Sequence, residues 1–173
     1  MIKALGSKHI IDSDRKTHEF YMIIKDMTEN LEVLKMKDFR HHYYSDCYQH
    51  SLNVAYYSYI ICKNLGFDYR SAARGAFLHD FFLYERKKRE RKKGEPSHNF
   101  YHPHIALKNA KKSFSISEIE EDIILNHMWP LTVSFPKHKE AYVVTAVDKY
   151  IAVAESSIFA YQKLTGKSSK PKS

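Results

Sequence analysis

The sequence is poor in the residues that break helices or cross-link small folds. Its 173 residues include only five glycines, five prolines and two cysteines. Scarce glycine and proline argue against the many tight turns of a β-rich fold. Cys47 and Cys62 form no CxxC pair, so we read them as small core residues and not as ligands of a zinc–thiolate site. Both observations favour a helical protein from a reducing compartment.

Long apolar runs are also missing. No stretch approaches the about 18 consecutive apolar residues of a spanning helix, and the first residues lack the apolar segment of a signal peptide. We therefore expect a cytoplasmic protein with no membrane partner. The length suits one domain with a sizeable core. The formal net charge of +8 favours an anionic ligand, such as a nucleotide or a nucleic acid.

Apolar residues recur at helical spacing along most of the chain, which predicts an all-α fold. Asp46, Asp68 and Ser117 each precede such a segment and are residue types that cap helix N-termini. After a loose start over residues 1–14, the expected helices cover residues 15–34 (as one helix or two), 47–65, 69–82, 105–114, 118–127 and 140–164. We assign residues 1–164 to a single domain with its core at about 42–156, and residues 165–173 to a disordered tail.

Residues 85–95 read ERKKRERKKGE and contain no core residue. A solvated surface loop explains such a run better than a dedicated binding surface does. The run also lacks the interleaved aromatic residues on which bases stack. Binding of nucleic acid through residues 86–93 remains the alternative.

The residues with most chemical promise begin with a His-Asp dipeptide, His79 and Asp80, at the end of the small apolar stretch 72–82. A carboxylate in such a setting is costly to bury unless it is paired or binds a metal. Asp148 poses the same problem, because it lies on an apolar helical stripe. Its neighbour Lys149 points about 100° away and is a poor partner.

Three further histidines extend this set: His50 on the inward stripe of its helix, and His102 and His127 at predicted helix ends. Alone, His50 or His127 would be read as a buried structural histidine. Taken together, the mixed imidazole and carboxylate side chains suit iron or manganese best, with zinc or magnesium as alternatives. Six side chains exceed what one catalytic ion needs, so we predict two ions bridged by Asp80.

His102 is predicted to be the metal ligand in preference to His104. Proline is favoured at the first helical position, so Pro103 would make His102 the N-cap of its helix. His104 would then lie in the first turn, rotated about 200° from His102. The two side chains could not easily serve one ion.

Four more polar residues are candidates for contacting an anionic substrate. Arg74 precedes His79 by about one helical turn, and its planar fork suits phosphate, although a surface salt bridge explains it about as well. His98 lies one turn before His102, with an ordinary loop histidine as the alternative. His42 and Lys149 complete the substrate-binding set.

The order His50, His79-Asp80, Asp148 resembles the HD superfamily of metal-dependent phosphohydrolases. With His102 and His127 added, it is similar to the two-metal branch, which includes diadenosine tetraphosphate hydrolases and cyclic-di-GMP phosphodiesterases. The segment 102–106, HPHIA, is similar to the HPxxG segment of the latter. The GYP motif of those phosphodiesterases is absent, and Leu83 stands where many relatives have a lysine. The segments 78–84, 102–110 and 127–132 resemble small stand-alone bacterial HD proteins most.

This resemblance implies a helical bundle with the metal site at its centre. It assigns His50, His79, Asp80 and Asp148 to a first ion, and Asp80, His102 and His127 to a second. His79 and Asp80 would be the catalytic pair. The implied reaction is hydrolysis of a phosphate ester or anhydride, in a nucleotide or similar small anion, by hydroxide held on the metal. A di-iron oxygenase and a non-catalytic nucleotide- or RNA-binding module remain alternatives, and homo-oligomer formation stays open.

Overall fold

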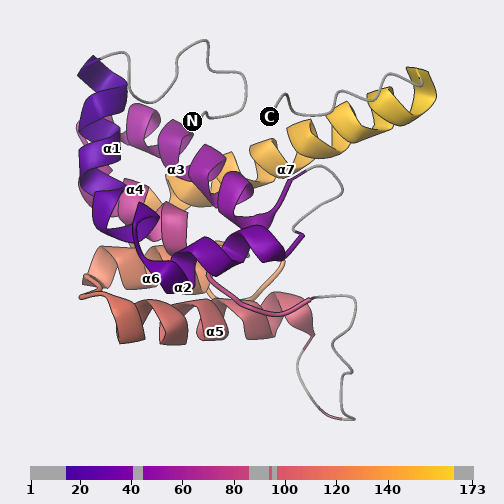
Figure 1. The fold of residues 1–173 in the computed structure, drawn as a ribbon. Helices are drawn as coiled ribbons and strands as arrows, with labels where there is room; N and C mark the ends of the chain where they lie inside the picture. Colours follow the sequence, from indigo (N-terminus) through magenta and orange to yellow (C-terminus); the bar gives the residue numbers. More distant parts are fainter. Residues whose placement is uncertain (1–14, 41–44, 86–93, 95–96, 166–173) are drawn as a thin grey trace.

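The computed structural model describes residues 15–40, 45–85, 94 and 97–165, and all its regular elements in these ranges are helical (Figure 1). The elements are α1 (Arg15–Thr28), α2 (Leu31–Leu34), a 3-10 turn (Lys35–Asp38), α3 (Cys47–Asn64), α4 (Tyr69–Leu78), α5 (His98–Ser113), α6 (Glu118–Asn126) and α7 (Lys139–Thr165). The predicted all-α class is confirmed.

The capping residues predicted from the sequence begin their helices as expected. The Asp46 side chain accepts a hydrogen bond from the main-chain N of Gln49 (2.7 Å), at the start of α3. Asp68 likewise caps α4. Ser117 and Glu120 form a reciprocal capping box at the start of α6. These local bonds satisfy main-chain N–H groups that have no partner within the helix.

Helix α4 lies at the centre of the bundle and contacts α1, α3, α5, α6 and α7. Its residues Ala72, Ala73, Gly75 and Ala76 are small and allow close approach. A Cβ built on Gly75 would lie 2.9–3.1 Å from side-chain atoms of Ile123 on α6. The absence of a side chain at Gly75 therefore lets α4 and α6 pack closely, and the C-cap residues of these two helices are His79 and His127.

Two helix boundaries differ from the sequence prediction. Helix α4 ends at Leu78 and not near Phe82, because the chain turns at His79 and Asp80. Helix α5 begins at His98, before both the predicted segment 105–114 and the predicted first helical position Pro103, so Pro103 lies inside it. Pro103 is the sixth residue of α5, so the helix forgoes the hydrogen bond that an N–H at this position would donate to the carbonyl of Asn99.

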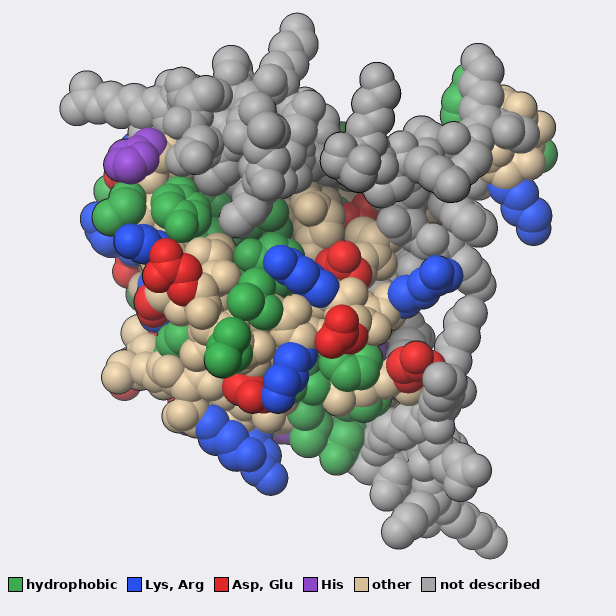
Figure 2. Space-filling model, in the orientation of Figure 1, with side chains coloured by type: hydrophobic (Ala, Val, Ile, Leu, Met, Phe, Trp, Pro, Cys, Tyr) green, Lys and Arg blue, Asp and Glu red, His purple; other side chains and the backbone are tan. Residues whose placement is uncertain are grey.

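On the face drawn in Figure 2, the described Lys and Arg side chains are interspersed with Asp and Glu. The positive net charge is therefore not gathered into one patch on the described part of this face. Among the described residues, no helix combines the length and the apolar character needed to cross a membrane.

Candidate metal centre

The His-Asp dipeptide lies at the turn that ends α4. His79 is the C-cap residue, and both His79 and Asp80 are buried. The main-chain N of Phe81 donates to the carbonyl of Leu78, and that of Phe82 donates to the carbonyl of Asp80 (2.7 Å). This tight turn ends the helix and fixes the backbone from which the two side chains enter the bundle.

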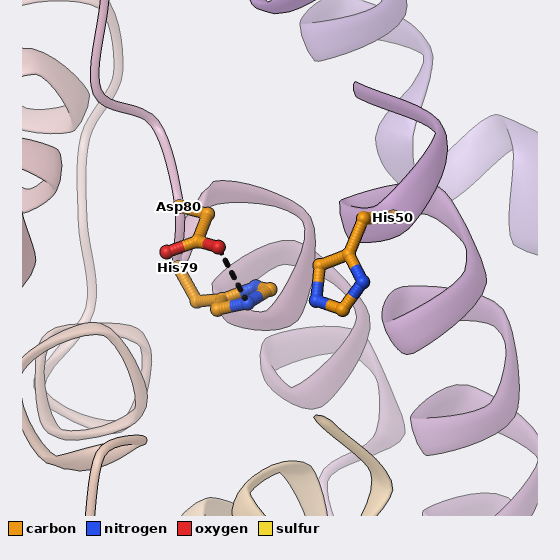
Figure 3. A group of neighbouring side chains, drawn as sticks. All are labelled: His50, His79 and Asp80. Carbon is orange, nitrogen blue, oxygen red and sulfur yellow. Dashed lines mark ion pairs between the residues drawn. The ribbon is translucent and has the colours of Figure 1, made fainter. Parts of the chain in front are cut away.

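A first group of ligand atoms comes from α3, the end of α4 and α7. Figure 3 shows His50 facing His79 and Asp80 across the bundle. Each of the three residues offers one ligand atom, and these three atoms lie within 4.8 Å of one another. His79 Nε2 lies 3.5 Å from Asp80 Oδ2 and 3.6 Å from Asp148 Oδ1. His50 Nε2 lies 3.0 Å from the same Asp148 oxygen. The structure therefore gathers all four residues predicted for the first ion.

A second group joins Asp80 to His102 on α5 and His127 at the end of α6. Asp80 Oδ1 lies 3.2 Å from His102 Nε2 and 3.8 Å from His127 Nε2. Asp80 thus directs Oδ2 toward the first group and Oδ1 toward the second. This is the arrangement that a carboxylate bridging two cations requires.

Three of these histidines are oriented by their own helices. His79, His102 and His127 each direct Nδ1 to a main-chain carbonyl three or four residues earlier. The acceptors are Ala76 (2.7 Å), His98 (2.8 Å) and Ile124 (2.9 Å). A carbonyl only accepts, so Nδ1 carries the hydrogen and a neutral ring leaves Nε2 with a lone pair. All three Nε2 atoms point into the cluster.

The resulting lone pairs fit a metal. His102 Nε2 and His127 Nε2 lie only 2.8 Å apart, where two lone pairs repel each other unless a proton or cation lies between them. His79 Nε2 is buried and has no hydrogen-bond partner within the described residues. Buried polar atoms are normally satisfied, and mixed imidazole–carboxylate ligands suit iron, manganese or zinc.

Electrostatics favours a cation over a proton at His127. Burial, together with the charges of His79 and His102, lowers the pKa of His127 to about 3. This ring therefore stays neutral near pH 7 and keeps its lone pair. In the first group, burial opposes charging of His50, but its hydrogen bonds to Asp148 and Glu155 raise its pKa to about 10. Burial likewise opposes ionisation of Asp148, yet the His50 hydrogen bond holds its pKa well below the usual value.

Comparison with known families agrees with this geometry. A family model described as HD domain matches residues 47–153, more than half of the chain. This chain belongs to the HD domain family. The matched segment of the HD domain contains all six clustered residues, from His50 to Asp148. No curated protein and no solved structure gives a significant match.

A cavity of about 240 Å³ opens beside the second group of the HD domain. Its lining comprises Asp80, His98, Asn99, His102, His127, Met128, Leu131, Asp148, Lys149 and Ala152. His50 and His79 are not among these residues and lie deeper. A molecule in the cavity would therefore meet the second group directly, with apolar side chains on part of the wall.

Two predicted substrate contacts lie at this cavity. Lys149 is half-buried, and its Nζ donates to the main-chain carbonyl of His127 (2.9 Å). Burial lowers the pKa of Lys149, and the smaller effect of the Asp148 charge raises it. The His98 ring stacks on His102 with centroids 4.5 Å apart, and its Nδ1 lies 3.1 Å from the hydroxyl of Tyr84. Both residues are placed where a bound anion could be reached.

For Arg74 the structure favours the salt-bridge alternative over contact with phosphate. Its Nε donates to Glu120 (3.0 Å), and its Nη1 donates to Asp26 (2.8 and 3.0 Å) and to the carbonyl of Ile23. Arg74 thus joins α4 to α1 and α6, away from the cavity lining. Glu120 is buried, and a buried carboxylate needs a cation, which explains why Arg74 pairs with it.

The N-cap role predicted for His102 is wrong. His102 is the fifth residue of α5, and the N-cap of that helix is Ser97. His102 reaches the cluster from within the helix, and His104 is exposed. His42 and the basic run 86–93 lie outside the described residues.

Sequence reasoning missed one residue of the site, Glu155. It is fully buried, and its Oε2 lies 3.1 Å from His50 Nδ1. Glu155 follows Asp148 by seven residues, about two helical turns, so both lie on one face of α7. That spacing was the available signal.

Proposed function

We propose that this HD domain hydrolyses a phosphate ester or anhydride of a nucleotide or similar small anion, using two divalent metal ions, iron or manganese. The supporting observation is the pair of facing Nε2 atoms of His102 and His127 at 2.8 Å, with Asp80 directing one oxygen to them and the other to the first group. Because burial lowers the pKa of His127, its Nε2 keeps a lone pair that a bound cation would satisfy.

The two groups have different roles in this proposal. His50, His79 and Asp148 would hold the deeper ion, while His102 and His127 would hold the ion beside the cavity. Asp80 would bridge both. Bound divalent ions supply a Lewis acid for phosphate oxygens and lower the pKa of water toward about 7.

The remaining cavity residues would bind and orient the substrate. Lys149 offers a positive charge beside Asp148, and its bond to the His127 carbonyl fixes the ammonium near the second group. Met128, Leu131 and Ala152 line the apolar part of the cavity, where the organic portion of the substrate would pack. A cavity of about 240 Å³ suits a small ligand better than a polymer.

Metal analysis and a phosphate-release screen test this function. Purified protein reconstituted with iron or manganese should hold about two ions per chain and release phosphate from at least one small nucleotide. Asp80→Ala should lose both properties while it stays folded, because it removes the bridge. The exposed Asp38→Ala serves as a control that should keep both.

Three outcomes would contradict the proposal. Fewer than about half an ion per chain after reconstitution would remove the dinuclear centre on which it depends. Oxygen consumption without phosphate release would identify an oxygenase. Nucleotide binding with no turnover in the metal-loaded protein would identify a binding module.

A further inference from the structure

The four histidines of the site differ in the group that their Nδ1 faces. Three direct Nδ1 to a neutral main-chain carbonyl of their own helix. His50 instead directs Nδ1 to the Glu155 carboxylate, which comes from another helix (3.1 Å). Glu155 lies two residues beyond the segment that the family model matches.

The structure around Glu155 is built to keep a carboxylate there. The side chain is 0% exposed. Ser45 Oγ donates to Oε2 (2.7 Å) and Asn53 Nδ2 donates to Oε1 (3.0 Å). Burying a carboxylate is costly, and these donors, together with His50, offset the cost. The donors come from α3 and from the residue just before its N-cap, so they hold Glu155 against the helix that carries His50.

The His50 ring lies between two carboxylates of α7. Its Nε2 is 3.0 Å from Asp148 on the side of the metal group, and its Nδ1 is 3.1 Å from Glu155 on the opposite side. An ionised carboxylate only accepts hydrogen bonds, so without a metal each ring nitrogen donates to the carboxylate that faces it. A cation bound at Nε2 would displace the hydrogen there, while Glu155 would keep the hydrogen on Nδ1, so that the ring would be a neutral ligand. A carboxylate acceptor also makes the imidazole a stronger ligand than a carbonyl does.

We propose that Glu155 is a positioning residue that acts through His50, fixing its tautomer and strengthening its Nε2 as a ligand of the deeper metal ion. This inference rests on the proposed function, because it requires the first group to hold a metal. It implies that the ion of the first group binds more tightly than the ion beside the cavity. Loss of the Glu155 charge should lower the affinity for the first ion and leave the affinity for the second ion unchanged.

Titration of metal-free protein with Co²⁺, followed by visible absorption, tests the proposal. Glu155→Gln preserves the shape but removes the charge. It should weaken the tighter Co²⁺ binding event by about 10–100-fold and leave the weaker event unchanged. Glu140→Gln is the matched control, because Glu140 is also buried on α7 (3% exposed) and accepts a hydrogen bond from the Asp68 main chain, away from the site.

A second measurement separates positioning from a structural role. In a His50→Ala background, Glu155→Gln should cause no further loss of Co²⁺ affinity, since the residue it acts through is gone. In wild type loaded with diamagnetic Zn²⁺, ¹⁵N NMR should report hydrogen on Nδ1 and metal on Nε2 of His50, and Glu155→Gln should shift the Nδ1 signal whereas Glu140→Gln should not. If Glu155→Gln fails to fold, Ser45→Ala removes one donor to the carboxylate and should give a smaller loss of the same binding event.

The outcomes distinguish this proposal from the proposed function. Wild-type protein that binds no Co²⁺ would overturn both. Wild-type binding of two ions with unchanged affinity in Glu155→Gln would overturn only the positioning role. A loss of equal size in the His50→Ala background would also overturn it, because Glu155 would then act through stability alone.

Discussion

His102 and His104, two residues apart on α5, face opposite environments. His102 is 3% exposed, with its Nε2 3.2 Å from Asp80 Oδ1, whereas His104 lies on the exposed side of the helix. Residues two apart on a helix are rotated by about 200°, so one helix cannot direct both rings to the same point.

The first prediction uses this pair. His102→Ala should lose one of the two ions and most of the hydrolytic activity, because the second group would keep only Asp80 and His127. His104→Ala should keep both ions and near wild-type turnover. Metal analysis and phosphate release, measured on the two variants in parallel, check this. Loss of an ion in His104→Ala would contradict the assignment of the second group.

The second prediction concerns Arg74. Arg74→Ala should lower the free energy of unfolding by roughly 1–3 kcal/mol, because Glu120 would remain buried without its cation. The metal content and the KM should not change. Urea unfolding and steady-state kinetics measure these quantities, and Arg70→Ala, at an exposed position of the same helix, is the control. A raised KM with unchanged stability would show that Arg74 contacts the substrate.

The third prediction concerns the close approach of α4 and α6. Gly75→Ala would gain about 1 kcal/mol of helix propensity but crowd Ile123, and such overpacking typically costs about 1–3 kcal/mol. We therefore expect a net loss of stability. In an Ile123→Val background the loss should shrink, because the contact at 2.9 Å, Ile123 Cδ1, is removed. A stabilised Gly75→Ala protein would show that the helices separate at little cost.

The fourth prediction is a pH dependence centred on Asp122. Asp122 Oδ2 accepts hydrogen bonds from the main-chain N of Lys137 (2.8 Å) and His138 (2.7 Å), which fixes the end of the loop before α7. Burial opposes ionisation, yet these bonds and those from the Asn126 and His138 side chains lower the pKa of Asp122 below its ordinary value of 3.8. Its contribution to stability is therefore present above pH 3.8 and is lost as the pH falls through the lower, folded-state pKa.

Asp122→Asn should accordingly destabilise the protein by roughly 1–3 kcal/mol at pH 7, and the difference from wild type should shrink at pH values below 3.8. Urea unfolding of metal-free protein across this range measures both effects. Asp38→Asn, at an exposed position, should leave stability unchanged at either pH. A difference that stays constant with pH would mean that the charge of Asp122 does not contribute.

Local features of the sequence determined the fold class and most helix starts. Helical spacing of apolar residues marks the buried stripes, and Asp46, Asp68 and Ser117 cap helices through bonds to residues two or three positions away. Such short-range relations can be read from the chain alone. Of the cluster residues, His50 and Asp148 were found this way, since a His or Asp on an apolar stripe needs a partner wherever the helix packs.

Only the tertiary structure decided the partners that come from distant segments. Arg74 pairs with residues 46 and 48 positions away, and His50 meets Glu155 across 105 residues. The local sequence does not show whether Arg74 or His50 contacts a distant side chain, a bound phosphate or solvent. The division of the oxygens of Asp80 between two groups, and the choice of Nε2 as the inward nitrogen, also follow from packing. Each depends on where five helices direct their side chains at once, and that arrangement exists only in the assembled bundle.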